Sequence, residues 1–467
     1  MLRGPARRRF RGQRVTSPAR IAAYRALRAI AAGRADLPSS LAHSRQELTD
    51  ERDRALAADI VTGTLRWQRN LDFVVQHLAG RPLSRIDDDV QHILRLSAYQ
   101  VLHLDRVPVS AVVNDAVTLT RRARKTSAAA LVNAVLRTLV RQRHRLPLPS
   151  RPASAEESAA LAYLGVTHSH PEWLVARWLR RYGFDATERW VRFNNDAPRV
   201  TLRANTVRTT RDEAAAALAR RGVETAPTPR APDGLVVTAG NPLGAPPDGT
   251  FLVQDEASQL VSLAVGAHRG ERILDLCASP GGKSVAMAGD TGDTGLLVAC
   301  DVRPRRIELL RQTVRTSGAR SVHVVHVAAS GGLPFAPAFD RVLVDAPCSG
   351  LGTIRRDPDI RWRRSERDLA VFARDQLALL ERAAEVVGPG GRLVYATCSS
   401  EPEEDEAVVD AFLARRVDFE PLDLRDDGAS PLVPLLDERG RLRTLPFAHG
   451  LEAFFAAALV RRGTIRS

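Results

Sequence analysis

The sequence DLCASPGGKS at residues 275–284 follows a short apolar segment and carries two adjacent glycines at the start of a predicted helix. Glycines directly after a strand let the backbone approach a ligand closely, and the next helix offers free N–H groups. The following predicted strand ends in Asp301, whose carboxylate can bind both hydroxyls of a ribose. Neither the Walker pattern G-x-x-x-x-G-K-S/T nor the dinucleotide pattern G-x-G-x-x-G is present in this stretch. It therefore predicts a site for an adenosine-containing cofactor without a long phosphate chain.

Around this stretch, from residue 251 onward, short apolar strands alternate with helices. Strands are predicted over residues 272–276, 295–300, 321–327, 341–344 and 391–397. The intervening helices include residues 303–317 and 368–387. This order predicts a doubly wound, mainly parallel sheet, in which ligands bind at the carboxyl ends of the strands. We therefore expect residues 251–467 to form a Rossmann-like α/β domain.

Two of these strands lead into cysteines. The motif DAPCSG occupies residues 345–350, and YATCSS occupies residues 395–400. Because parallel strands end at one edge of the sheet, we expect Cys348 and Cys398 to lie side by side near the cofactor. A single cysteine is most often a small buried hydrophobic residue. Two thiols in polar turns at this edge instead indicate reactive groups.

The chain before the sheet is predominantly helical. Helical periodicity of apolar residues over 21–146, with breakers near Pro38 and Pro108, predicts an all-helical domain of five to seven helices. A linker rich in Pro, Ser and Glu covers about 147–158.

A small α+β connecting domain is expected over residues 159–250. Its predicted elements are helices over 173–182 and 185–193, a strand over 199–204 and a helix over 210–221. The Pro- and Gly-rich stretch 226–249 breaks this pattern and is predicted to be irregular.

The charge of the chain indicates a polyanionic partner. The formal net charge is +14, and residues 1–20 hold seven arginines without an acid, which predicts a basic disordered arm that contacts phosphate. A coding bias toward arginine is an alternative source of this charge, because only Lys125 and Lys283 are lysines. The same bias makes Lys283 informative, since a lysine beside two glycines indicates a site that a guanidinium does not fit.

The four cysteines and the hydropathy exclude several classes of protein. The cysteines are far apart, with no C-x-x-C pair and no histidine at metal-ligand spacing, so neither a zinc site nor a disulfide framework is expected. No apolar run approaches the roughly 18 to 20 residues that span a bilayer. We expect a cytoplasmic, monomeric protein with free thiols, without a membrane span or a metal.

The three motifs DLCASPGGKS, DAPCSGLG and YATCSSEPEEDE, in this order, resemble the Sun/Fmu family of bacterial 16S rRNA (cytosine-5) methyltransferases. The helical region over 21–143 resembles the NusB-like RNA-binding domain that this family carries in front, so the resemblance covers nearly the whole chain. It implies an enzyme that uses S-adenosylmethionine to methylate C5 of a specific cytosine in 16S rRNA through a covalent bond between a cysteine and C6.

The resemblance also implies roles for individual residues. Cys398 is implied to be the nucleophile and Cys348 to assist product release, while Asp345 lies near the base. The residues implied to bind the cofactor are Cys277, Ala278, Ser279, Pro280, Gly281, Gly282, Lys283, Asp301, Arg306 and Asp345. One position departs from the family, because Ala329 stands near the end of the third strand, where an Asp usually meets the adenine amino group.

The substrate base must leave its stack to reach such a pocket, which favours a single-stranded or flexible RNA segment. A cluster after the fourth-strand motif is expected to bind this segment, with a solvated helix entry as the alternative interpretation. Its members are Arg355, Arg356, Arg361, Trp362, Arg363 and Arg364.

Two other functions stay open at this point. A tRNA cytosine-5 methyltransferase would use the same chemistry, because only the front domain points to the ribosome. A non-catalytic RNA-binding or ribosome assembly factor would keep the sheet without activity, and both cysteine motifs argue against it. An amino-group methyltransferase would need a D/N-P-P-Y loop where this chain has DAPC at residues 345–348.

Overall fold

The structure is a computed structural model that describes residues 16–153, 156–244, 246–428 and 430–463. It divides into two compact units, one formed by residues up to 177 together with 357–359, and the other by 178–356 with 360–467. Most of the basic arm predicted over residues 1–20 lies outside the described residues.

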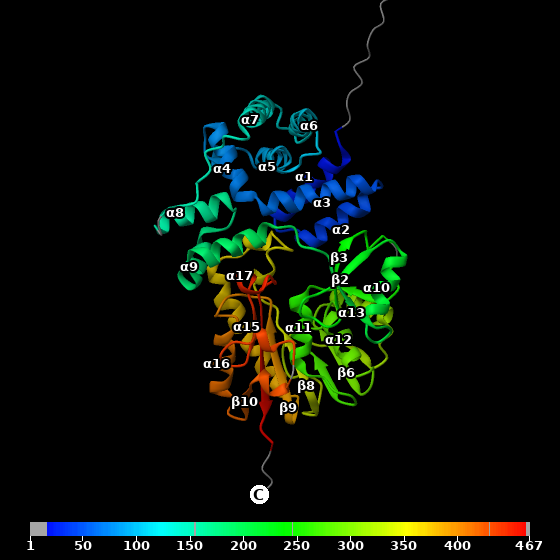
Figure 1. The fold of residues 1–467 in the computed structure, drawn as a ribbon. Coiled ribbons are helices and arrows are strands. Elements are labelled where there is room, and N and C mark those ends of the chain that lie inside the picture. Colours follow the sequence, from blue (N-terminus) through cyan, green and yellow to red (C-terminus); the bar gives the residue numbers. More distant parts are fainter. Residues whose placement is uncertain (1–15, 154–155, 245, 429, 464–467) are drawn as a thin grey trace, which may run out of the picture. The chain divides into compact units, whose positions relative to one another are not determined.

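The first unit is helical. Its helices are α1 (Pro18–Ala31), α2 (Leu37–Glu47), α3 (Glu51–Arg66), α4 (Gln68–Ala79), α5 (Asp88–His103), α6 (Val109–Arg122), α7 (Ala129–Gln142) and α8 (Glu157–Ala162) (Figure 1). Fully buried residues such as Ile60, Leu94 and Leu136 belong to one continuous core that α1 to α7 share. The side chains of Asp36, Asp50 and Asp87 accept backbone N–H groups at three helix starts, which explains where these helices begin. The predicted all-helical front domain is confirmed.

Helix α1 begins earlier than the sequence suggested. Arg20 is 6% exposed; it donates to Gln100 Oε1 over 2.7 Å and pairs with Asp115 over 2.6 Å. Residues from Pro18 onward therefore belong to the helical core rather than to the predicted arm.

Helix α9 (Glu172–Asn195) contains a break. Gly183 has φ 77° and ψ 177°, outside the helical region, which only glycine adopts readily. The helices predicted over 173–182 and 185–193 correspond to its two halves.

A small antiparallel sheet follows, with strand order β2-β3-β1-β4. Its elements are β1 (Thr201–Ala204), α10 (Arg211–Arg220), β2 (Glu224–Pro227), β3 (Gly234–Ala239) and β4 (Phe251–Val253). The predicted strand over 199–204 and helix over 210–221 are confirmed, and the helix begins at a capping box formed by Thr210 and Glu213. The prediction for 226–249 was wrong in part, because β3 lies inside this stretch.

The large sheet has the order β10-β12-β9-β8-β5-β6-β7, with β11 paired to β12. Its strands are β5 (Arg272–Asp275), β6 (Leu296–Asp301), β7 (Val322–His326), β8 (Phe339–Asp345), β9 (Val387–Thr397), β10 (Phe419–Leu422), β11 (Leu442–Thr444) and β12 (Phe454–Arg461). The five strands from β5 to β9 pair in parallel, whereas β12 is antiparallel to β9 and to β10. The predicted doubly wound, mainly parallel sheet is confirmed, with an antiparallel edge that was not predicted.

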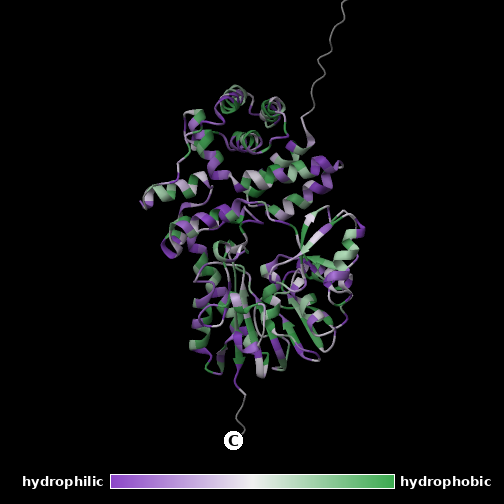
Figure 2. Ribbon diagram, in the orientation of Figure 1, coloured by the Kyte–Doolittle hydropathy of each residue, from purple (hydrophilic) through white to green (hydrophobic). Residues whose placement is uncertain are grey.

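Helices cover both faces of this sheet. They are α11 (Glu256–Val265), α12 (Gly282–Asp290), α13 (Pro304–Ser317), α15 (Glu366–Ala384) and α16 (Glu406–Arg415). This part of the chain also contains the short helices α14 (Ile360–Arg363) and α17 (Pro446–His449). Successive strand residues point to opposite faces, so Ile273 packs with α11 to α13 and Leu274 packs with α15 and α16. The middle residues of the central strands are accordingly hydrophobic, whereas polar residues lie toward their ends (Figure 2).

The described residues contain neither a membrane-spanning helix nor a cluster of metal-binding side chains. None of the helices in that part of the chain has the length and apolar character needed to cross a membrane. The same residues contain no group of three or more His, Cys, Asp or Glu side chains that could hold a metal ion.

Candidate active site

The two motif cysteines meet at the carboxyl edge of the large sheet. Strands β8 and β9 are parallel neighbours, with Asp345 opposite Ala396, so the loops that follow them lie together. The Sγ atoms of Cys348 and Cys398 are 3.2 Å apart. Both cysteines are partly buried. The predicted proximity of the two thiols is confirmed.

Their surroundings favour the protonated form of Cys348. The hydrogen bond with the Cys398 thiol is the largest cause that raises the pKa of Cys348 well above its usual value, and burial and the charge of Glu404 add to the rise. The Cys348 thiol therefore stays protonated at neutral pH and is available as a proton donor.

Lys283 and Asp345 form an ion pair beside the thiols. Lys283 Nζ lies 2.7 Å from Asp345 Oδ2, and the lysine side chain is only 12% exposed. Burial lowers the pKa of Lys283, but the charge of Asp345 and its hydrogen bond outweigh this effect, so the pKa lies above its usual value. The pair brings the glycine motif and the first cysteine motif together.

A cavity of about 290 Å³ lies at this edge of the sheet. Its lining includes the predicted residues Cys277, Ala278, Ser279, Pro280, Gly282, Lys283 and Asp345. Residues that were not predicted to bind the cofactor also line it, namely Val253, Gln254, Asp255, Ser258, Asp275 and Arg356, of which Arg356 was expected to contact RNA instead. This volume is at the lower end of the range for small-molecule sites, about 300 to 1,000 Å³.

Asp301, Arg306 and Gly281 adjoin this wall without forming it. Asp301 is 5% exposed, accepts the Arg303 N–H over 3.0 Å and has the Arg306 guanidinium 3.8 Å away. The backbone oxygen of Arg306 accepts the Ser279 hydroxyl over 3.1 Å, which connects α13 to the glycine turn.

The glycine turn and its neighbour Asp275 fit a polar ligand. Gly281 has φ 110°, and an added Cβ would lie 2.9 Å from Leu310 Cδ1, so only glycine fits comfortably. Gly281 caps α12 without a side-chain hydrogen bond, which leaves N–H groups at the helix start. Asp275 Oδ1 is buried and has no hydrogen-bond partner among the described residues. Buried polar atoms are normally hydrogen-bonded, and a ligand in the cavity can donate the hydrogen bond that Asp275 Oδ1 lacks.

Asp275 is held by its other oxygen. Ser284 Oγ donates to Asp275 Oδ2 over 2.7 Å, which ties the end of β5 to α12. Burial is the main cause that raises the pKa of Asp275 to about 7. The sequence placed this residue at the strand end but assigned it no role.

Within the arginine cluster after β8, Arg361 differs from its prediction, whereas Arg363 is exposed and the other members are partly exposed. Arg361 is fully buried and donates to Asn195 Oδ1 over 3.1 Å and to Asn194 O over 3.4 Å. Arg356 pairs with Glu452 over 2.8 Å, and Arg364 donates to Ser349 O over 2.9 Å. Arg361 is therefore a structural residue and does not bind RNA, because water and ligands cannot reach it.

Two further features bear on the predicted residues. Ala329 is exposed in the turn after β7, and its methyl group cannot accept a hydrogen bond from an adenine amino group. Glu404 is fully buried between the cysteine loops, where Ser349 and Ser399 donate to it. The run EPEEDE looks solvated in the sequence, and only the spacing of Glu401 and Glu404 hinted that one side of it faces inward.

Comparisons with known proteins agree with this architecture. The model of the family described as 16S rRNA methyltransferase RsmB/F matches residues 262–460. A NusB family model matches residues 17–141, and a model of the ferredoxin-like domain of RsmF/B-like methyltransferases matches residues 170–243. These matches confirm the NusB-like front domain and give the small connecting domain its fold type.

Two of the similar proteins are named as small-subunit rRNA methyltransferases. The chain is 34% identical over 422 residues to "Probable ribosomal RNA small subunit methyltransferase B" of Bacillus subtilis, which covers 89% of this chain and 92% of that protein. It is 33% identical over 446 residues to ribosomal RNA small subunit methyltransferase B of Pseudomonas putida, with 95% and 98% covered.

Solved structures share the architecture. The crystal structure of PH0851 covers 95% of this chain and 98% of its own, with 26% identity and a TM-score of 0.76. NSun6 from Pyrococcus horikoshii, crystallised with SFG, an analogue of S-adenosylmethionine, shares the fold at 18% identity and a TM-score of 0.54.

Proposed function

Because the chain belongs to the RsmB/F family of 16S rRNA methyltransferases, we propose that it methylates C5 of a cytosine in small-subunit rRNA through a covalent cysteine intermediate. The observation that carries this proposal is the pair of thiols 3.2 Å apart at the ends of β8 and β9. Methylation of an oxygen or an amino group needs no thiol, whereas C5 methylation uses one. C5 of cytosine is too weak a nucleophile until a thiolate has added to C6.

The two cysteines divide the covalent steps. Cys398 forms the Sγ–C6 bond, and the electron pair displaced from the ring makes C5 nucleophilic toward a methyl group. After C5 has been methylated, a base takes the C5 proton, the Sγ–C6 bond breaks and its electrons return to form the ring double bond. Cys348, held against Cys398, assists this release directly or through a water that it orients.

S-adenosylmethionine, the cofactor of the family, supplies the methyl group when bound. The residues that would hold it are those at the glycine turn, with Asp301 and Arg306 beside them. Asp345, hydrogen-bonded to Lys283 over 2.7 Å, would accept a hydrogen bond from the amino edge of the base. The unpartnered oxygen of Asp275 would accept a hydrogen bond from the cofactor.

Substituting each cysteine tests the proposal. We expect Cys398→Ala to abolish both methylation and any covalent RNA adduct, because no thiolate starts the reaction. Cys348→Ala should form the bond but release it slowly, so a protein–RNA complex should accumulate. The measurement is denaturing gel electrophoresis after incubation with S-adenosylmethionine and unmodified 16S rRNA, with bisulfite sequencing to locate the methyl group.

Cys300 provides the matched control. It is fully buried in the sheet core, so Cys300→Ala makes the same change away from the thiol pair and should leave adduct formation and turnover near those of the unmodified protein. Accumulation of the adduct with Cys398→Ala, and its loss with Cys348→Ala, would reverse the two roles. Full activity of both variants would exclude covalent catalysis by these thiols.

A further inference from the structure

We infer that Glu404 is a positioning residue that joins the two cysteine loops and sets the geometry of the two thiols. The inference rests on the proposed function, because it concerns the same two cysteines. Glu404 is fully buried, and its carboxylate accepts the hydroxyls of both serines that follow the cysteines, which also lie 3.4 Å from each other.

The contacts of Glu404 come from both sides of the thiol pair. Its Oε1 accepts the backbone N–H of Ser349 over 2.7 Å and Gln376 Nε2 over 3.1 Å. Its Oε2 accepts the hydroxyls of Ser349 over 2.5 Å and Ser399 over 2.6 Å. Ser349 follows Cys348 and Ser399 follows Cys398. One carboxylate therefore fixes the position of the residue after each thiol.

The surrounding elements fix Glu404 itself. Tyr395 OH donates to the Glu404 carbonyl over 2.6 Å, and the Glu404 N–H donates to Glu401 O over 3.0 Å. Gln376, on α15, also donates to Pro347 O over 3.0 Å, directly before Cys348. A displacement of the carboxylate would thus move both loops, and their relative position is what the proposed mechanism requires.

A carboxylate suits this position better than a neutral side chain. Its two oxygens accept four hydrogen bonds, whereas a glutamine offers one acceptor oxygen and turns an NH₂ group toward donors. Burial of a charge is unfavourable unless it is fully hydrogen-bonded, which the four donors achieve. After the hydrogen bond with Cys398, burial and the charge of Cys398, the negative charge of Glu404 also raises the pKa of Cys348. The residue thus favours a protonated Cys348 beside Cys398.

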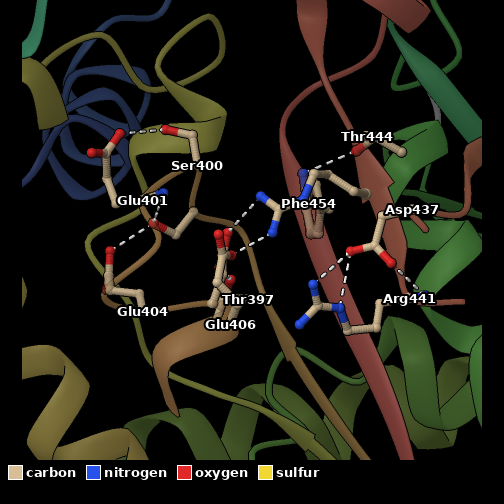
Figure 3. A network of polar contacts seen from close by, with 12 residues as sticks. Thr397, Ser400, Glu401, Glu404, Glu406, Asp437, Arg441, Thr444 and Phe454 are labelled. Carbon is tan, nitrogen blue, oxygen red and sulfur yellow. Dashed lines mark hydrogen bonds and ion pairs between the residues drawn. The ribbon is translucent and has the colours of Figure 1, made fainter. Parts of the chain in front are cut away.

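Ser400 offers a matched control for the two serines. It is as buried as Ser399, but its hydroxyl donates to Glu401 Oε1 over 2.8 Å instead of to Glu404. Figure 3 shows this bond between Ser400 and Glu401, apart from the Glu404 carboxylate. Ser400→Ala therefore removes a serine hydroxyl from the same loop without removing a hydrogen bond to Glu404.

The experiment compares Glu404→Gln, Glu404→Asp, Ser349→Ala, Ser399→Ala and Ser400→Ala in the full chain. We expect Glu404→Gln to lower the rate of methyl transfer by about a hundredfold, the cost of misplacing a reacting group by about 1 Å. Cofactor affinity, measured by calorimetry, should stay unchanged, because the cavity lining does not include Glu404. Ser349→Ala and Ser399→Ala should lower the rate less, and Ser400→Ala should retain it.

A second measurement is independent of RNA. Alkylation of Cys348 by iodoacetamide, followed by mass spectrometry as a function of pH, reports its protonation. Glu404→Gln removes the negative charge, so the alkylation profile of Cys348 should shift to lower pH. Glu404→Asp keeps the charge but is too short to reach both loops, so it should keep the profile closer to that of the original protein and still lose methylation.

The outcomes separate this inference from the proposed function. If the unsubstituted protein forms no 5-methylcytosine, the proposed function fails, while the alkylation profiles still test the role of Glu404. If that protein methylates C5 and Glu404→Gln does so equally fast, the positioning role is overturned. Equal losses in Ser399→Ala and Ser400→Ala would likewise assign the effect to general loop packing. Should Glu404→Gln fail to fold, the serine variants decide the question.

Discussion

Asp275 is the residue whose ionisation should be visible in the stability of the protein. Burial raises its pKa from 3.8 to about 7. Between these values the folded chain holds a proton that the unfolded chain releases, so the contribution of Asp275 to stability is lost as the pH rises from about 4 to about 7. Asparagine does not titrate, so the stability of Asp275→Asn should not fall in this way as the pH rises.

The measurement is the free energy of unfolding by denaturant at several pH values, taken as the difference between Asp275→Asn and the original protein. As the pH rises from about 4 to about 7, the free energy of unfolding of Asp275→Asn should increase relative to that of the original protein. The other titrating groups are present in both proteins, so their contributions to the pH dependence cancel in this difference. Parallel pH profiles for the two proteins would show that Asp275 is ionised throughout.

The buried acids show what a sequence cannot reveal about single residues. Glu401, Glu404 and Asp405 are 2%, 0% and 0% exposed, although six consecutive residues around them are acidic or proline. Their partners come from distant parts of the chain: Trp178 donates to Glu401, and Arg443 pairs with Asp405. The motif cysteines, by contrast, were predictable because strand ends fix their place regardless of distant partners.

At the level of elements, the turn that follows Cys348 depends on close backbone contacts. Gly352 donates its N–H to Cys398 O over 3.0 Å, and its oxygen accepts the Ala453 N–H over 3.0 Å. A Cβ added there would lie 1.9 Å from Ala453 O and 2.8 Å from Cys398 O, and neither backbone atom can move alone. Gly352→Ala should therefore destabilise the protein by about 1 to 3 kcal/mol, as overpacking does, and should slow methylation.

Gly332 gives a control for this change, because an added Cβ there meets no atom within 4 Å. Gly332→Ala should leave both stability and turnover near those of the original protein. The two variants are compared by denaturant unfolding and by the rate of methyl transfer. If Gly352→Ala keeps the stability and the methylation rate of the original protein, the backbone of this turn can shift to accommodate the added methyl group.

The elements predicted correctly are those with a clear local signal. Strands β5 to β9 are short apolar runs between turns and helices, and the sequence indicated all five. Strand β12 was missed because its segment FFAAALVR is apolar at nearly every position and rich in alanine. Its first six residues are buried, so the alternation that marks a half-buried strand is absent. Only its pairing with β9 and β10 makes it a strand.

For the molecule as a whole, the net charge of +14 predicts a steep salt dependence of RNA binding. Each phosphate contact should change the slope of log affinity against log salt by about −0.7 for a single-stranded segment. Cofactor affinity should change little, because its cavity is a local site. Filter binding and calorimetry across a salt series measure the two quantities on the same preparation. An RNA affinity that is as insensitive to salt as the cofactor affinity would contradict this prediction.

The division of the chain into units has a consequence for its modularity. The sequence crosses between the two units three times, after residues 177, 356 and 359. A single break after residue 177 would therefore separate the turn residues 357–359 from the rest of the helical unit. Asp359, in that short segment, accepts the N–H of Leu37 at the start of α2 over 3.3 Å. The helical unit is therefore built from two separate stretches of sequence, and a chain cut after residue 177 would leave the Leu37 N–H without this partner.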